Sequence, residues 1–184
     1  MKLEGAAVVL RAFKPSDAPA VCAAMKDGSV ARWTLYIPWP YKKKDAVKFI
    51  RSRKTRWRKG KDYCLAVVCK EDGRLAGSVS LLRVDKKHKV AEMGYWLGAR
   101  YRGKGLAAEA VALLLGLGFK KLGMEKIRGH VFAENRASQR LLEKKGFKRE
   151  GLLRKDLVKR GKRRDLIAYG LLKREYKPLK ARER

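Results

Sequence analysis

The 184-residue chain has few acidic residues and almost no side-chain amides. It contains 18 Asp and Glu against 48 Lys and Arg, and a single asparagine and glutamine, Asn135 and Gln139. The formal net charge of +30 is far more than solubility needs, and such a field concentrates polyanions such as RNA, DNA or the ribosome. A biased genome composition is the alternative source of this excess.

Long apolar runs and metal-ligand spacings are also missing. No stretch approaches the roughly 20 apolar residues of a transmembrane helix. Residues 1–5 lead into strand-like sequence without the apolar segment of a signal peptide, so we expect a cytoplasmic protein without membrane association. Cys22, Cys64 and Cys69 lack metal spacing, so we expect free thiols and no metal site.

The apolar fraction, 46%, is sufficient for a sizeable core, and the length suits one domain. We expect this domain to span residues 1–175, with residues 176–184 as a charged tail. Two segments concentrate the positive charge: residues 42–61 hold eleven basic residues and residues 154–164 hold seven, each with one acidic residue. No sequence-reading motif accompanies them, so association with nucleic acid or a ribonucleoprotein would use phosphate contacts.

Hydrophobic periodicity predicts the order of the elements. The expected strands are residues 6–14, 62–69, 74–84, 90–97, 125–133, 147–153 and 165–172. The expected helices are residues 17–26, 45–59, 106–121 and 135–145. Three successive antiparallel strands before a strand–loop–helix unit indicate an α+β sheet rather than a doubly wound one.

The most aromatic stretch is Trp33–Tyr41. Pro38 and Pro40 interrupt it, so a structured loop is expected rather than a helix or strand. Such a loop either lines a binding cleft or covers the core as a hydrophobic lid. The sequence leaves both interpretations open.

A glycine-rich loop, residues 98–105, joins the strand at 90–97 to the helix that starts at Leu106. Gly103 and Gly105 allow a tight turn and a close approach to a ligand. The free N–H groups at the helix start, with the positive end of the helix dipole, favour an anion such as a pyrophosphate. The loop has neither the Gly-Lys-Ser/Thr ending of a P-loop nor the glycine spacing of the dinucleotide fingerprint.

Two motifs, in this order, resemble the GNAT superfamily of N-acetyltransferases. Arg100-x-x-Gly103-x-Gly105 is similar to its acetyl-CoA signature, and the segment 135–147, Asn-Arg-Ala-Ser…Gly-Phe, is similar to its second helix motif. The segments 91–97 and 10–17 resemble the RimJ/RimL-like branch. The resemblance covers nearly the whole chain and implies a three-layer α/β/α domain with a mixed, mostly antiparallel central sheet.

The resemblance also implies a site. The residues expected to bind acetyl-CoA are Trp96, Leu97, Arg100, Tyr101, Arg102, Gly103, Lys104, Gly105, Leu106, Ala107, Asn135 and Ser138. An amine must lose a proton before it attacks a thioester, and Glu92 is the expected base, with a salt-bridged strand carboxylate as the alternative. N–H groups near Leu97 would polarise the thioester oxygen. Many members have a tyrosine acid where Leu142 stands here, which leaves Ser138 as the candidate acid.

These residues imply an enzyme that transfers acetyl from acetyl-CoA to a primary amine by direct attack in a ternary complex. Members of the RimJ/RimL-like branch acetylate protein N-termini, including ribosomal ones, so a protein N-terminus is the expected acceptor. The alternatives are a small-molecule amine or antibiotic acetyltransferase, and a ribosome- or nucleic-acid-binding protein with a vestigial acetyl-CoA site. A monomer or a homodimer would fit each of these three interpretations.

Overall fold

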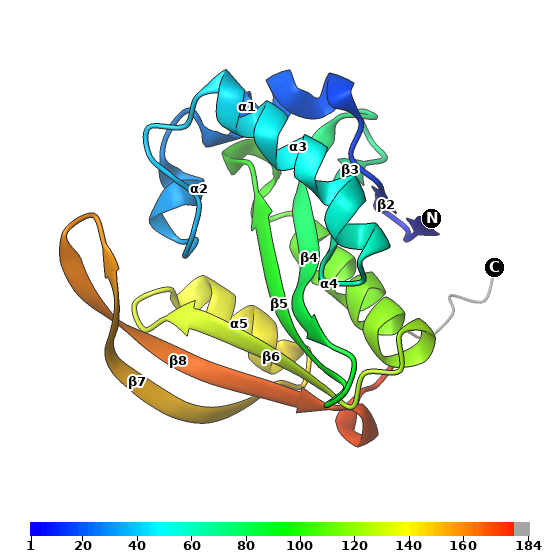
Figure 1. The fold of residues 1–184 in the computed structure, drawn as a ribbon, viewed down its shortest axis with the longest axis vertical. Coiled ribbons are helices and arrows are strands. Elements are labelled where there is room, and N and C mark those ends of the chain that lie inside the picture. Colours follow the sequence, from blue (N-terminus) through cyan, green and yellow to red (C-terminus); the bar gives the residue numbers. More distant parts are fainter. Residues whose placement is uncertain (179–184) are drawn as a thin grey trace.

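Eight strands form one sheet in the computed structural model, which describes residues 1–178. The strands are β1 Lys2–Glu4, β2 Val8–Arg11, β3 Tyr63–Cys69, β4 Leu75–Asp85, β5 Val90–Leu97, β6 Lys126–Phe132, β7 Lys148–Lys159 and β8 Lys162–Leu172. The helices are α1 Ala18–Met25, α2 Ser29–Arg32, α3 Lys43–Arg58, α4 Leu106–Gly116 and α5 Arg136–Lys144. The spatial order of the strands is β1-β2-β3-β4-β5-β6-β8-β7 (Figure 1).

The sheet is antiparallel except between β5 and β6. Those two strands run parallel and pair only over Val90–Glu92 and Lys126–Arg128. Beyond these pairs β5 continues beside β4, and β6 continues beside β8, so the two strands separate (Figure 1). The mixed, mostly antiparallel sheet predicted from the sequence is confirmed, and it opens at its only parallel junction in the described chain.

Helices cover both faces of the sheet. Leu106, Ala110 and Leu114 of α4 pack on one face in the larger apolar core. On the other face Val21 of α1 and Ile50 of α3 belong to a second core. These layers place α3 over the middle strands (Figure 1). In the described part of the chain, no helix combines the length and apolar character needed to cross a membrane.

The predicted bounds of the strands were accurate in the middle of the chain and wrong near both ends. The expected strand 6–14 is only Val8–Arg11, and a short strand, Lys2–Glu4, precedes it. The short helix Ser29–Arg32 was not predicted. The helix expected to reach residue 121 is regular to Gly116 and ends in a π-helical turn, Leu117–Lys121. The expected tail lies outside the described residues from residue 179 onward.

The largest error concerns the basic segment 154–164. The strands expected at 147–153 and 165–172 are longer, and together they form one hairpin with its turn at Arg160–Gly161. Basic side chains occupy both faces at the tip of this hairpin, so the apolar alternation that reveals a strand is absent there. The basic segment therefore belongs to two paired strands and their turn, whereas the sequence analysis placed it between two shorter strands.

The cysteines agree with the sequence-based prediction in their chemistry. All three are free thiols; Cys64 and Cys69 are buried, and Cys22 is half-buried. Cys69 lies in the larger core, whereas Cys64 contacts the hydroxyls of Ser78 and Ser80 on the other face of the sheet. Cys64 and Cys69 therefore lie on opposite faces of the sheet.

Candidate active site

A cavity of about 720 Å³ lies where β5 and β6 separate. Its walls come from β4, β5, β6, α3, α5 and the aromatic loop 33–41. Four of the residues predicted from the sequence line it: Glu92, Trp96, Asn135 and Ser138. The sheet opening therefore brings the candidate base and the candidate acid into one space.

Glu92 projects from β5 into this cavity, and its side chain is 12% exposed. Its Oε2 pairs with Nη1 of Arg83 at 2.5 Å, and its Oε1 lies 3.6 Å from Nδ1 of His130. Burial by itself would raise the pKa of Glu92, but His130 and the charge of Arg83 outweigh it and lower that pKa. The carboxylate is thus held ionised at neutral pH, as a proton acceptor requires.

Ser138 lies in the first turn of α5, where the Asn135 side chain caps the helix by accepting from the Ser138 N–H at 3.2 Å. The hydroxyl of Tyr95, on β5, donates to Ser138 Oγ at 2.9 Å. Burial raises the pKa of Tyr95, and the bond to Ser138 only partly offsets this effect. Because Tyr95 donates to it, the Ser138 hydroxyl can direct its own proton to another acceptor.

The glycine loop carries the geometry expected of an anion site. Gly103 and Gly105 have φ values of +76° and +77°, and Gly105 directly precedes the first residue of α4. A Cβ at either glycine would meet nothing within 4 Å, so the space next to the loop is open. The early N–H groups of α4 point out of the helix start, which suits a pyrophosphate.

Two arginines of the loop are held by protein partners. Arg100 pairs with Asp72 at 2.8 Å, and the Tyr101 hydroxyl donates to the same carboxylate at 2.8 Å. Arg102 donates to the Leu97 carbonyl at 3.0 Å and to Ser29 Oγ at 2.8 Å. These side chains brace the loop, so the backbone N–H groups and Lys104 are the groups best placed to meet an anion.

We expect Gly105→Ala to raise the Kd for CoA about tenfold. An alanine at φ +77° is strained by about 1–2 kcal/mol and would turn the first N–H groups of α4 away from their present direction. Calorimetric titration with CoA measures the change. Gly123→Ala is the matched control because Gly123 has φ +66°, open space around it, and a position at the opposite end of the helix. Equal Kd values for the two variants would contradict the prediction.

The aromatic loop 33–41 and the tip of the β7–β8 hairpin meet over the cavity. Lys159 Nζ donates to the carbonyls of Leu35 and Ile37 at 3.3 and 3.0 Å, and Arg160 lies over the Trp39 ring at 5.5 Å. Burial, and then the charge of Arg160, lower the pKa of Lys159. The loop therefore lines the cleft, which is one of the two roles that the sequence left open. Lys159 and Arg160 of the hairpin hold the loop in this position.

Three residues of this cavity had no role in the sequence analysis. His130 adjoins Glu92 because β5 and β6 pair in parallel at Glu92 and Arg128, two residues before His130. Arg83 projects from an irregularity in the β4–β5 pairing and has φ +49°. Tyr95 reaches Ser138 from β5. A correct prediction of the β5–β6 register would have placed His130 beside Glu92. The sequence carries no signal for the pairing irregularity at Arg83.

Comparison with known proteins identifies the fold and the family. Residues 7–148 match the family model described as "Acetyltransferase (GNAT) domain". The chain is 31% identical over 171 residues to "Uncharacterized N-acetyltransferase p20" of Bacillus licheniformis, which covers 92% of this chain and 94% of that protein. It is 35% identical over 105 residues, 57% of each chain, to "Putative ribosomal N-acetyltransferase YdaF" of Bacillus subtilis (strain 168).

The fold agrees with a solved structure titled "RimL- Ribosomal L7/L12 alpha-N-protein acetyltransferase in complex with Coenzyme A". The TM-score is 0.86 at 17% identity, over 94% of this chain and 98% of that one. The relative and the structure named as ribosomal acetyltransferases agree with the RimJ/RimL-like resemblance of the sequence. With a family model that spans residues 7–148, the chain belongs to the GNAT family of acetyltransferases.

Proposed function

We propose that this acetyltransferase modifies the N-terminal α-amino group of a protein, by direct attack in a ternary complex. The observation that carries the proposal is the cavity in which ionised Glu92 and the Tyr95–Ser138 pair lie together. An α-amino group has a pKa of about 8, so a nearby carboxylate need only take one proton from it. Residues 1–175 would act as one catalytic domain.

Acetyl-CoA is the cofactor of this family, and the structure of this chain fits it. The open space beside Gly103 and Gly105 suits a pyrophosphate, which the loop and the start of α4 would hold. Trp96, Leu97 and Asn135, where β5 and β6 separate, would hold the arm that enters the cavity. When bound, acetyl-CoA supplies an activated acetyl thioester.

The chain's own groups then handle charge and protons. Glu92 accepts the proton of the acceptor ammonium, directly or through a water. N–H groups near Leu97 polarise the carbonyl oxygen. Ser138 would donate a proton to the leaving sulfur and take one from Tyr95 through the 2.9 Å hydrogen bond between the two hydroxyls, while the second proton of the attacking nitrogen leaves to solvent, from which Tyr95 is reprotonated. Each step uses a group that lines the cavity or lies at its edge.

We expect Ser138→Ala to lower kcat about tenfold, less than the 10²–10⁴-fold typical of a general acid, because a thiolate leaves readily. Tyr95→Phe should have a smaller effect. The double variant should match Ser138→Ala, since Tyr95 acts through Ser138. Thiol release under saturating substrates measures kcat for all three. Losses that multiply in the double variant would show that the two hydroxyls act independently.

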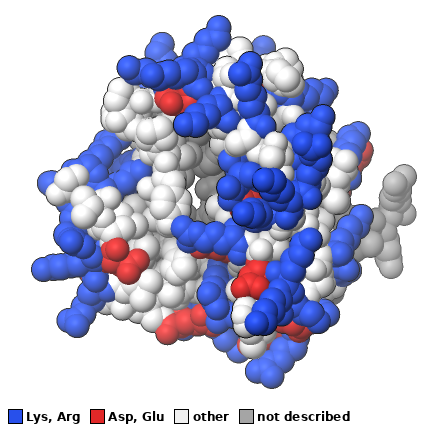
Figure 2. All heavy atoms as spheres, in the orientation of Figure 1, with Lys and Arg blue, Asp and Glu red and all other residues white. Residues whose placement is uncertain are grey.

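The positive surface charge favours a substrate that is attached to an anionic partner. Figure 2 shows Lys and Arg spread over the viewed face, with few Asp and Glu among them and a hollow near its centre. α3 and the β7–β8 hairpin, which both carry exposed bases, lie on the two sides of the loop 33–41 (Figure 1). We propose that this surface brings the enzyme to a ribosomal or nucleic-acid-bound substrate through phosphate contacts.

The test is thiol release from acetyl-CoA with a panel of acceptors. The panel contains peptides with Ser, Thr, Ala and Met N-termini, an aminoglycoside, spermidine and free amino acids. Turnover on peptides supports the proposal, and the relative rates show which N-terminal residue the enzyme prefers. Turnover confined to small amines would overturn it in favour of a small-molecule acetyltransferase. No turnover, with tight and salt-sensitive RNA binding, would favour a binding protein with a vestigial site.

A further inference from the structure

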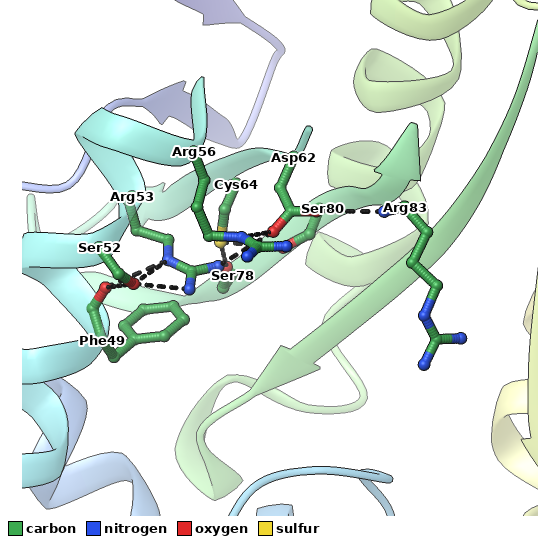
Figure 3. Close-up of polar contacts among 9 residues, drawn as sticks. All are labelled: Phe49, Ser52, Arg53, Arg56, Asp62, Cys64, Ser78, Ser80 and Arg83. Atoms are coloured by element: carbon green, nitrogen blue, oxygen red, sulfur yellow. Dashed lines mark hydrogen bonds and ion pairs between the residues drawn. The ribbon is translucent and has the colours of Figure 1, made fainter. Parts of the chain in front are cut away.

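The acceptor side of the cavity contains a cluster of arginines arranged around one buried carboxylate. Asp62, at the start of β3, is 3% exposed. Its Oδ2 pairs with Nε of Arg56 and lies 3.8 Å from Nη1 of Arg53, both on α3, and its Oδ1 accepts from the backbone N–H of Arg83 at 3.1 Å. Figure 3 shows the side chains of Arg53 and Arg56 converging on Asp62, whereas the Arg83 side chain extends away from it.

Asp62 therefore has two effects. It holds Arg56 at the cavity wall while that side chain remains 44% exposed. It also anchors the backbone at Arg83, whose positive φ and position in a pairing irregularity would otherwise leave its N–H without a strand partner. One carboxylate faces two guanidinium groups, so positive charge is in excess at this wall.

Arg83 places a further positive charge beside Glu92, the proposed base. Its side chain is 57% exposed, its Nη1 pairs with Glu92, and its Nη2 contacts the Tyr36 hydroxyl of the aromatic loop. The guanidinium lies 5.1 Å from the centroid of the Tyr36 ring. Arg83 thus pairs with Oε2 of the carboxylate to which an incoming ammonium group would also bind.

An acceptor ammonium that binds Glu92 takes over the partner of Arg83. The Arg83 guanidinium is then left without its counter-ion. An acceptor that brings an anionic group as well as its ammonium replaces one ion pair with two. A carboxylate also matches the paired N–H groups of a guanidinium in geometry.

We propose that Arg83 forms a subsite for a carboxylate side chain, with Arg56 adding positive charge to the wall of the same cavity. The preferred acceptors are then protein N-termini with Asp or Glu in the first three residues. The inference rests on the proposed function and narrows its substrate class. Successive residues of an extended peptide advance about 3.3–3.6 Å, so such a side chain lies close to the reacting amine. Asp62 acts as a positioning residue for both arginines.

The test compares matched peptides that begin Ser-Asp, Ser-Asn and Ser-Lys, and the same residues at the third position. We expect kcat/KM to be at least about tenfold higher for the Asp peptide than for the Asn peptide, and lowest for the Lys peptide. Calorimetric titration of the same peptides in the absence of acetyl-CoA should rank them identically. Arg83→Gln should remove the preference, so that the ratio of kcat/KM for the Asp peptide to kcat/KM for the Asn peptide falls to about one.

Arg58→Gln is the matched control, because Arg58 lies on α3 but does not line the cavity. It should keep the Asp preference. The charge reversal Arg83→Glu should favour the Lys peptide. Equal kcat/KM for the Asp and Asn peptides with wild-type protein would overturn the subsite and leave the proposed function standing. Turnover of free acidic amino acids but of no peptide would overturn both.

Discussion

Glu92→Gln is expected to lower kcat by about 10²–10⁴-fold while the Kd for CoA stays unchanged. The amide keeps the size and most contacts of the carboxylate but cannot accept a proton. Glu92 is half-buried and paired with Arg83 and His130, so its pKa is lowered and it is ionised throughout the neutral range. Thiol release and calorimetric titration with CoA separate the loss of chemistry from a loss of binding.

Glu125→Gln is the control, because Glu125 is an exposed carboxylate that contacts Lys173 outside the cavity. It should retain full activity. The lowered pKa of Glu92 also has a consequence for pH dependence: because the carboxylate stays ionised throughout the neutral range, its titration should not limit the wild-type rate there. A Glu92→Gln enzyme within about threefold of wild type would remove Glu92 from the mechanism.

Gly77→Ala is expected to destabilise the protein by about 3 kcal/mol or more and to abolish activity. Gly77, in β4, pairs with Leu97 of β5, and a Cβ there would overlap the carbonyl oxygen of Trp96 and lie 3.0 Å from Leu97 Cα. These are backbone atoms, so the strand itself must move. The movement would occur at the segment where the thioester is proposed to lie.

The matched control is Gly151→Ala, which places a Cβ in open space in β7. Thermal unfolding monitored by circular dichroism should show a large decrease in Tm for Gly77→Ala and little change for Gly151→Ala. CoA affinity should fall with Gly77→Ala at temperatures where the variant is still folded. An unchanged Tm would show that β4 and β5 can separate without loss.

Local sequence signals predicted the parts of the site that depend on short segments. The glycine loop and the Asn135 cap each lie within one strand–helix or loop–helix unit, and both have the expected geometry. The antiparallel order of β3, β4 and β5 followed from short turns such as the one at Gly73. Each of these features is determined by residues close together in the chain.

The features that the sequence did not reveal depend on long-range register. His130 reaches Glu92 only because β5 and β6 pair in parallel, although 38 positions separate the two residues in the printed sequence. Arg83 reaches the same carboxylate only because the β4–β5 pairing is irregular near it. The β7–β8 hairpin was missed because its tip is basic on both faces. No local pattern encodes these relations.

The hydrogen bonds from Lys159 to the carbonyls of Leu35 and Ile37 join segments that are more than 120 residues apart in sequence. Neither segment supplies the proposed base, the proposed acid or the glycine loop. We therefore expect substitutions at Lys159 to alter which acceptors enter more than they alter the reaction chemistry. For directed selection of new acceptor ranges in the laboratory, the hairpin tip is therefore the place to begin, because it holds the loop that lines the cavity without touching the proposed base.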